Sequence, residues 1–270
     1  MKKASNKLEE QVKLVDFVIV LLDSRIPLSS RNDLLEKIAI NRNKLYVLTK
    51  KDLSDEEMTK RWITALSKDG DYAIAIDLKN NSSKKELVEA CTKFASLKRE
   101  KYLKRGVKNV NIKAMVIGIP NVGKSTLINL FASKKITKTG NEPGVTKNTR
   151  WVRVGDFELM DVPGILEPSY KSKEKANNLA LIGSMKETIL PTHDLCYLCL
   201  DFLKKYYLEA LNKRYSIEAK DLKNDEIVEQ IAKNRGFFQK HETPDIDKCE
   251  LIILNEFRNG IITKFTLERI

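Results

Sequence analysis

The residues with the clearest chemical potential form a short glycine-containing stretch, Gly118-Ile119-Pro120-Asn121-Val122-Gly123-Lys124-Ser125-Thr126. A glycine, four further positions and then Gly-Lys-Ser is the spacing of a phosphate-binding P-loop. Gly118 and Gly123 permit tight turns that direct successive backbone N–H groups into one concavity, and a helix N-terminus adds partial positive charge there. We expect Lys124 to reach the β- and γ-phosphates of a nucleotide and the Ser125 hydroxyl to bind Mg²⁺.

The sequence on either side of this loop supports that interpretation. Residues 114–117 are apolar and predict a buried strand, and residues 126–131 predict the start of a helix. A strand, a loop and a helix in this order are the context that a P-loop requires, since an isolated match can be an ordinary turn that binds nothing. The loop residues that we expect to contact nucleotide are Asn121, Val122, Gly123, Lys124, Ser125 and Thr126.

A second group of residues indicates which base is bound. Thr49-Lys50-Lys51-Asp52 follows the apolar residues 45–48 and resembles the Asn-Lys-x-Asp element of GTPases. A carboxylate at Asp52 can accept hydrogen bonds from N1–H and the exocyclic amine of guanine, whereas adenine offers no such pair of donors. The stem of Lys50 can lie over the base. Thr49 replaces the usual Asn, and its hydroxyl can make fewer bonds to the neighbouring loop.

Two further stretches have the spacing of loops that sense the γ-phosphate. Asp161-Val162-Pro163-Gly164 fits an Asp-x-x-Gly element, in which Asp161 would hold Mg²⁺ through a water and the Gly164 N–H would contact the γ-phosphate. Pro143-Gly144-Val145-Thr146 fits the other loop, where Thr146 would complete a Mg²⁺ shell that needs few protein ligands. We therefore expect Lys124, Thr146 and Gly164 to act on the transferred phosphate.

Apolar runs alternate with helical periodicity through the first 170 residues. Runs at 17–22, 45–48 and 73–76 predict buried strands with helices between them, which indicates a doubly wound α/β sheet. Ligands of such sheets lie beyond the carboxyl ends of the strands. Asp77 and Leu78, after the third run, are expected to offer backbone contacts to the base.

From about residue 170 the pattern becomes helical. A hairpin at 151–154 and 157–160 is the last strand signal before it. The expected helices lie near residues 176–190, 195–212, 225–236 and 247–259. We therefore expect a nucleotide-binding domain over residues 1–169 and a small C-terminal helical domain over residues 170–270, for which the family resemblance given below implies binding to ribosomes or rRNA.

The order of the motifs is informative. A Ras-like chain begins with the P-loop and reads the base later, whereas here Thr49 and Asp77 precede Gly118. The sequence thus predicts a P-loop NTPase sheet in circularly permuted order, with the base-reading motifs G4 and G5 ahead of G1, G2 and G3. Permutation moves the chain ends without changing the sheet. Gly164 then lies directly before the helical domain, which a γ-phosphate switch could reposition.

Charge restricts the class of partner. The sequence holds 49 Lys and Arg against 37 Asp and Glu, a net charge of +12, which favours a polyanion without separating RNA, DNA and an acidic membrane face. The segment Lys98–Lys113 is basic apart from Glu100 and is either a solvated connector or an RNA-facing surface. We find no signal sequence and no apolar run of about 20 residues, and so expect a cytoplasmic protein without stable membrane association.

The cysteines offer a weaker signal. Cys196 and Cys199 form a C-x-x-C pair, and His193 lies three residues before it. A zinc site normally needs a second pair of ligands at suitable spacing, and the sequence has none. The apolar neighbours favour buried packing over metal or redox chemistry.

At this point the sequence strongly resembles the circularly permuted GTPases of the YlqF type, the ribosome biogenesis GTPase A family. The resemblance covers nearly the whole chain, is less specific beyond Pro168, and rests on residues 23–32 (Asp-Ser-Arg-Ile-Pro-Leu-Ser-Ser-Arg-Asn), 118–126, 143–146 and 161–166. It implies a Mg²⁺-dependent GTP hydrolase that alternates between GTP and GDP. It also implies action in late assembly of the large ribosomal subunit and binding to the rRNA of its precursor. We expect a monomer.

Two departures from the resembled family concern hydrolysis. The family usually begins with a Trp-Phe-Pro-Gly-His stretch whose His assists hydrolysis, and the only histidines here are His193 and His241. Either the true start lies upstream or other groups act, so the sequence offers no histidine candidate. Ile165 stands where Ras-like enzymes place a water-orienting Gln, as is normal for the resembled family. We expect slow hydrolysis by the isolated protein and stimulation by the ribosomal particle.

Some alternatives stay open on the sequence alone. Asn121 either ligates a K⁺ ion that substitutes for an arginine finger, as in related potassium-dependent GTPases, or only shapes its loop. The protein could be an RNA-associated scaffold that binds GTP with little or no hydrolysis. A membrane-surface or DNA-associated GTPase would use the same positive charge.

Overall fold

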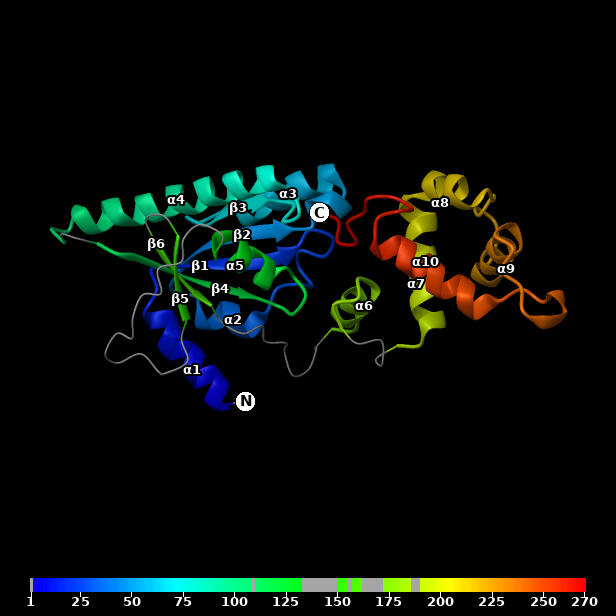
Figure 1. Cartoon of the computed structure of the whole chain (residues 1–270), viewed down its shortest axis with the longest axis horizontal. Helices are drawn as coiled ribbons and strands as arrows, with labels where there is room; N and C mark the ends of the chain where they lie inside the picture. The colour runs from blue at the N-terminus through cyan, green and yellow to red at the C-terminus, as the bar shows by residue number, and fades with distance from the viewer. Residues whose placement is uncertain (1, 108–109, 133–149, 155–156, 162–171, 186–189) are drawn as a thin grey trace. The chain divides into compact units, whose positions relative to one another are not determined.

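The computed structural model describes residues 2–107, 110–132, 150–154, 157–161, 172–185 and 190–270. Its contacts divide the chain into two units (Figure 1). The sheet unit comprises residues 1–52, 56–169 and 270, and the helical unit comprises residues 53–55 and 170–269. Three residues that follow Asp52 therefore belong with the C-terminal part of the chain.

The sheet unit alternates strands and helices along the chain. Its strands are β1 (Phe17–Asp23), β2 (Asn43–Thr49), β3 (Tyr72–Ala75), β4 (Ile112–Gly118), β5 (Arg150–Val154) and β6 (Phe157–Asp161). Its helices are α1 (Lys2–Lys13), α2 (Asp33–Ile38), α3 (Glu56–Leu66), α4 (Asn81–Leu103) and α5 (Lys124–Ala132), and a short 3₁₀ helix, η1 (Lys51–Leu53), spans the boundary between the units.

The six strands form one sheet in the order β3-β2-β1-β4-β6-β5. Every neighbouring pair is parallel except β5 and β6, which form the antiparallel hairpin. The predicted P-loop sheet in permuted order is confirmed. β2 and β3, which lead to the predicted base-reading residues, precede β4, which leads into the P-loop, and all three lie parallel in one sheet. Since parallel strands end at the same edge, the ends of β2, β3, β4 and β6 meet there.

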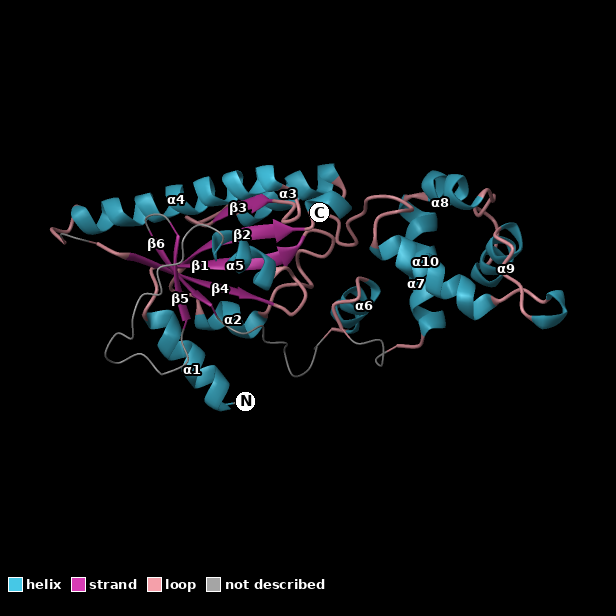
Figure 2. Ribbon diagram, in the orientation of Figure 1, coloured by secondary structure: helices cyan, strands magenta, loops and turns pink. Residues whose placement is uncertain are grey.

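Alternation along β1 explains why both faces of the sheet are covered. Val18, Val20 and Leu22 face a core that α1, α2 and α3 complete. Phe17 belongs to the opposite face, where its ring centroid lies 5.0 Å from that of Phe94 in α4 and 6.0 Å from that of Phe157 in β6. Figure 2 shows α4 along one side of the sheet and α1 and α2 on the other.

The basic segment predicted at Lys98–Lys113 is partly helical. α4 continues to Leu103, so the segment begins on its last turns and ends inside β4. The Tyr102 hydroxyl donates to Asp16 Oδ1 at 2.6 Å, and Lys113 N donates to Asp16 Oδ2 at 2.8 Å, which anchors the segment to the sheet unit. None of the helices within the described residues is long and apolar enough to cross a membrane.

The helical unit contains the helices expected after residue 170, with two differences: the helix expected near 176–190 ends already at Leu181, with Ile182 as its C-cap, and the one expected near 195–212 is divided. The observed helices are α6 (Lys173–Leu181), α7 (Thr192–Tyr206), α8 (Leu208–Tyr215), α9 (Asn224–Asn234) and α10 (Ile246–Arg258), with a short 3₁₀ helix, η3 (Lys240–Glu242). The single helix predicted over 195–212 is wrong, because Tyr207 adopts φ −141° and ψ 38° and separates α7 from α8. The Tyr207 hydroxyl donates to Asp55 Oδ2 at 3.0 Å.

Aromatic packing and a partly buried ion pair hold the helical unit together. Phe257 of α10 stacks on Phe265 with ring centroids 3.9 Å apart, and Phe202 of α7 lies edge-on to both. Arg214 pairs with Glu256, whose carboxylate also accepts from Tyr215 Oη at 3.0 Å. These contacts join α7, α8, α10 and the C-terminal segment into one core.

Replacement of Phe17 by Ala should destabilise the sheet unit by about 3–5 kcal/mol, since it removes a fully buried ring between two aromatic neighbours and leaves a cavity. Urea denaturation followed by fluorescence would measure this. The matched control is Leu97→Ala on α4, where the side chain is 51% exposed and the change should stay within about 0.5 kcal/mol. Equal effects of the two substitutions would contradict the core assignment.

Candidate nucleotide-binding site

The P-loop has the backbone geometry that its sequence predicts. β4 ends at Gly118 and α5 begins at Lys124, with Leu127 N donating to Gly123 O at 2.9 Å. Gly123 has φ +101°, and a Cβ there would lie 2.7 Å from Leu78 Cδ1. Asn121 also adopts a positive φ, +62°. The loop therefore needs glycine at Gly123, and it leads into the N-terminus of α5, whose partial positive charge suits an anion.

The side chains expected to meet phosphate and metal begin this helix. Lys124 is partly buried, and Ser125 and Thr126 are exposed in the first turn of α5. Asp161 ends β6, and its backbone is paired in register with Val116 of β4, two residues before Gly118. Hydroxyl and carboxylate oxygens are the ligands that Mg²⁺ prefers, so the donor set at these strand ends fits that ion.

The predicted base-reading element is joined directly to the P-loop. Thr49 is the last residue of β2 and is fully buried. Its hydroxyl donates to Val122 O at 2.7 Å and lies 3.1 Å from Leu22 O. A hydroxyl has one proton, so it serves two carbonyls less well than the two N–H groups of an Asn amide would. This hydroxyl nevertheless links residues that are 73 positions apart in the sequence.

Lys50 and Asp52 follow in the order that the predicted motif requires. Lys50 has φ +58°, and its Nζ lies 2.8 Å from Asp23 Oδ2. Asp52 lies in η1 with its side chain 31% exposed, and Lys79 Nζ approaches its Oδ2 at 4.0 Å. The Lys51 N–H donates to Ile76 O at 3.3 Å, which ties the element to the end of β3.

Asp77 and Leu78 lie directly after β3, as predicted, apart from a shift of the strand itself to Tyr72–Ala75. Asp77 Oδ1 accepts from Lys79 N at 2.8 Å, so the carboxylate shapes its own turn. Leu78 reaches the P-loop beside Gly123. The structure thus brings together Thr49, Leu78, Val122 and Gly123 from three strand ends.

A buried ion pair beside Lys50 was not assigned from the sequence. Asp23 ends β1, and its carboxylate is bound by Arg25 as well as by Lys50. Burial would raise the pKa of Asp23, but these two cations outweigh it and lower the pKa to about 2. The ion pair therefore stabilises the fold fully above about pH 4 and is lost only as the pH falls towards 2. The signal for this pair in the sequence was a carboxylate, Asp23, and a cation, Arg25, two residues apart at the end of a strand.

The remaining predicted site residues cannot be placed. Thr146 and Gly164 lie outside the described residues, as does the side chain of Asp161.

Cys196 and Cys199 are fully buried in α7, and burial raises the pKa of both thiols. Across the part of the chain that the structure describes, no group of three His, Cys, Asp or Glu side chains could hold a metal ion. Both cysteines pack as apolar side chains.

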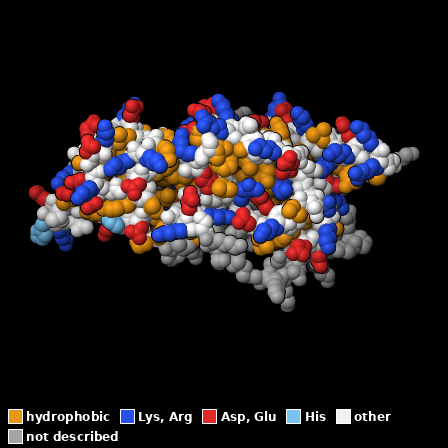
Figure 3. Space-filling view, turned by 180° about the vertical axis from the view of Figure 1, so that it is seen from behind, with side chains coloured by type: hydrophobic (Ala, Val, Ile, Leu, Met, Phe, Trp, Pro, Cys, Tyr) orange, Lys and Arg blue, Asp and Glu red, His pale blue; other side chains and the backbone are white. Residues whose placement is uncertain are grey.

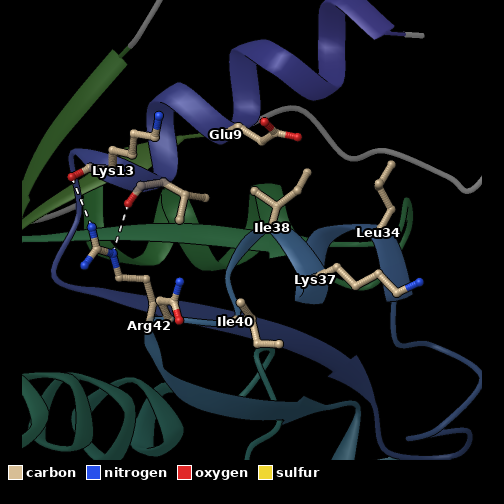
Figure 4. A pocket seen from close by; sticks show the side chains of 9 residues that line it. Glu9, Lys13, Leu34, Lys37, Ile38, Ile40 and Arg42 are labelled. Carbon is tan, nitrogen blue, oxygen red and sulfur yellow. Dashed lines mark hydrogen bonds between the residues drawn. The ribbon is translucent and has the colours of Figure 1, made fainter.

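A hollow of about 590 Å³ lies elsewhere on the sheet unit, between α1 and α2 (Figure 4). Its lining includes Lys13, Ile38 and Arg42, and Arg42 donates through Nε to Val12 O at 3.2 Å and through Nη2 to Lys13 O at 3.2 Å. None of the predicted nucleotide-binding residues lines this hollow. It is distinct from the strand-end site.

Known proteins match both the site and the whole chain. Residues 113–238 match the family described as "50S ribosome-binding GTPase". The chain is 39% identical over 269 residues to ribosome biogenesis GTPase A of Bacillus cereus, covering 99% of this chain and 91% of that protein. It is 38% identical over 270 residues to ribosome biogenesis GTPase A of Priestia megaterium, covering 99% and 94%.

Two solved structures show the same fold. A GDP-bound structure of TM YlqF matches with a TM-score of 0.67 and 21% identity, over 97% of this chain and 98% of that chain. The GNP-bound YlqF from T. maritima matches with a TM-score of 0.63 and 23% identity, over 99% and 98%. Near-complete coverage of relatives close to 40% identical, together with the strand-end geometry, shows that this chain is a GTPase that belongs to the ribosome biogenesis GTPase A family.

Proposed function

We propose that this GTPase binds the guanine base at the ends of β2 and β3 and the phosphates at the start of α5, and couples GTP hydrolysis to late assembly of the large ribosomal subunit. The 2.7 Å contact between the Thr49 hydroxyl and Val122 O is the observation that carries this proposal, because it joins the base-reading element to the P-loop. Asp52 reads the guanine edge, the Lys50 stem covers the base, and Asp77 and Leu78 supply backbone contacts.

The phosphate end of the site relies on charge and hydrogen bonds. Lys124 and the N–H groups from Asn121 to Thr126 bind the β- and γ-phosphates. Ser125, Thr146 and, through water, Asp161 hold Mg²⁺, which supplies charge neutralisation at the phosphates. Water attacks in line while Lys124, Thr146 and the Gly164 N–H position the γ-phosphate and stabilise its charge. Ile165 cannot orient this water, so hydrolysis is slow until the ribosomal particle assists.

Asn121 has one role that the structure supports and a second that needs testing. Its φ of +62° lies in the left-handed region, which Asn tolerates better than most residues, so it shapes the loop. We propose in addition that its side chain can ligate K⁺ near the phosphates. Replacement of K⁺ by Na⁺ separates the two roles, because a loop-shaping residue leaves hydrolysis indifferent to the cation.

The proposed partner is the precursor of the large subunit, bound through its rRNA by a monomer in the cytoplasm. Lys and Arg side chains are interspersed with Asp and Glu on the face shown in Figure 3. The end of α4 is a more local basic surface, where Lys101, Lys104 and Arg105 are exposed. We propose that this end of α4, together with the helical unit, contacts rRNA.

Asp52→Asn should change the base preference. The amide becomes partly a donor, so it loses one of two charged hydrogen bonds to guanine and suits the C2 carbonyl of xanthine; GDP affinity should fall roughly 100-fold, about 3 kcal/mol. Competition of GDP, XDP and ADP against a fluorescent GDP would measure this. Asp69→Asn is the matched control, because Asp69 is exposed with φ +55°, where Asn is well tolerated. An unchanged GDP to XDP ratio in Asp52→Asn would remove Asp52 from the base site.

Phosphate release from GTP should be slow for the isolated protein and rise at least about tenfold with large ribosomal subunits, since positioned groups supply the missing catalysis. The measurement compares release with and without subunits in K⁺ and in Na⁺. Lys124→Ala should abolish nucleotide binding. Tight GTP binding without release above background in every condition would instead identify a GTP-binding scaffold.

Substitution of Lys101, Lys104 and Arg105 by Ala should weaken co-sedimentation with large subunits by about tenfold and reduce its salt dependence, because each phosphate contact releases counterions. The matched control replaces the exposed Lys60, Arg61 and Lys68, which changes the net charge equally. Equal losses in the two variants would show that net charge acts without a specific surface. Binding that does not depend on a GTP analogue would count against a switch.

A further inference from the structure

The loop that follows β1 is buried, although loops normally lie on the surface. Ser24, Arg25, Ile26 and Ser30 are each at most 2% exposed. Its sequence is part of the resemblance described above, but none of the nucleotide contacts proposed so far involves it. Burial of this much polar backbone and charge requires a structural reason.

The centre of this loop is a carboxylate held by two cations. Arg25 donates through Nε to Asp23 Oδ1 at 2.9 Å and through Nη2 to Oδ2 at 2.8 Å, and Lys50 Nζ lies 2.8 Å from the same Oδ2. The side chains of Asp23 and Arg25 are 1% and 2% exposed, and that of Lys50 is 28% exposed. A bidentate pair fixes the carboxylate plane, and the carboxylate in turn fixes the Lys50 ammonium.

The same loop also binds the backbone of Thr49, the residue that precedes Lys50. Ser24 donates to Thr49 O twice, from N at 3.0 Å and from Oγ at 2.7 Å. Asp23 N donates to Ser30 Oγ at 3.0 Å, which closes the loop on itself. Lys50 then has φ +58°, a conformation that a residue with a Cβ keeps only when its surroundings enforce it.

We propose that Asp23, oriented by Arg25, is a positioning residue for guanine nucleotide binding, because its ion pair with Lys50 holds the Lys50 stem and its left-handed backbone in the arrangement that receives the base. This inference rests on the proposed function, in which the base lies against Lys50 and Asp52. Thr49 and Asp23 then have complementary roles. Thr49 sets the distance to the P-loop, and Asp23 sets the direction of the stem of the next residue, Lys50.

A double-mutant cycle on GDP affinity tests the proposal. Lys50→Met keeps an unbranched apolar stem and leaves the bidentate Asp23–Arg25 pair intact, so the variant should fold, with a melting temperature that is lowered by the loss of one of the two cations on Asp23. GDP should bind at least fivefold more weakly, since the stem is no longer anchored. Asp23→Asn should weaken GDP binding to a similar or greater degree. The double variant should bind GDP no more than about threefold more weakly than the weaker-binding single variant. Lys60→Met, an exposed change on α3, is the control.

The outcomes separate this inference from the proposed function. Lys50→Met with unchanged GDP affinity, or losses that multiply in the double variant, would overturn the positioning role. That result leaves the proposed function standing if the unmodified protein prefers GDP to ADP and Asp52→Asn shifts the preference to XDP. If Asp23→Asn does not fold, the comparison of Lys50→Met with Lys60→Met still decides. Both Asp23→Asn and Lys50→Met should keep the GDP to XDP ratio, because Asp52 still reads the base.

Discussion

One buried hydrogen bond joins the two halves of the candidate site, which lie far apart in the sequence. The Thr49 hydroxyl donates to Val122 O at 2.7 Å inside a fully buried environment, where an unpaired carbonyl would cost about 1–3 kcal/mol. The bond fixes the end of β2 against the P-loop. In the proposed function, base recognition and phosphate recognition can then share one nucleotide, although their motifs occur in the chain in the reverse of the Ras-like order.

The order of the strands in the sheet explains why the reversed order of the motifs does not separate them. β1 lies between β2 and β4 and pairs with both in parallel, so it sets the register between the base-reading and phosphate-binding halves. Its own end supplies Asp23, which adds an ion pair to the contact made by Thr49. A permutation changes which loops connect the strands, while the edge at which the strands end is unaffected.

Much of this arrangement could be predicted because the signals were local. The glycines of the P-loop, the apolar run before it and the helix after it all lie within residues 114–131, and the structure reproduces them. The role of Asp23 could not be read, because a carboxylate at a strand end looks the same whether it meets solvent or two cations. The break at Tyr207 was also hidden, since apolar residues continue with helical spacing across it while the Tyr207 hydroxyl makes a tertiary contact to Asp55. Pairing between distant segments thus set the limit of prediction.

The membership of residues 53–55 in the helical unit has a mechanical consequence. Leu53 O accepts from Phe265 N at 3.1 Å, so the helical unit begins one residue after Asp52, the proposed guanine-reading carboxylate. Asp52 and Leu53 are consecutive, so a movement of Leu53 is felt in the backbone torsions next to Asp52. If Asp52 reads guanine as proposed, a partner bound to the helical unit would act on nucleotide exchange from the base end and not through the phosphates.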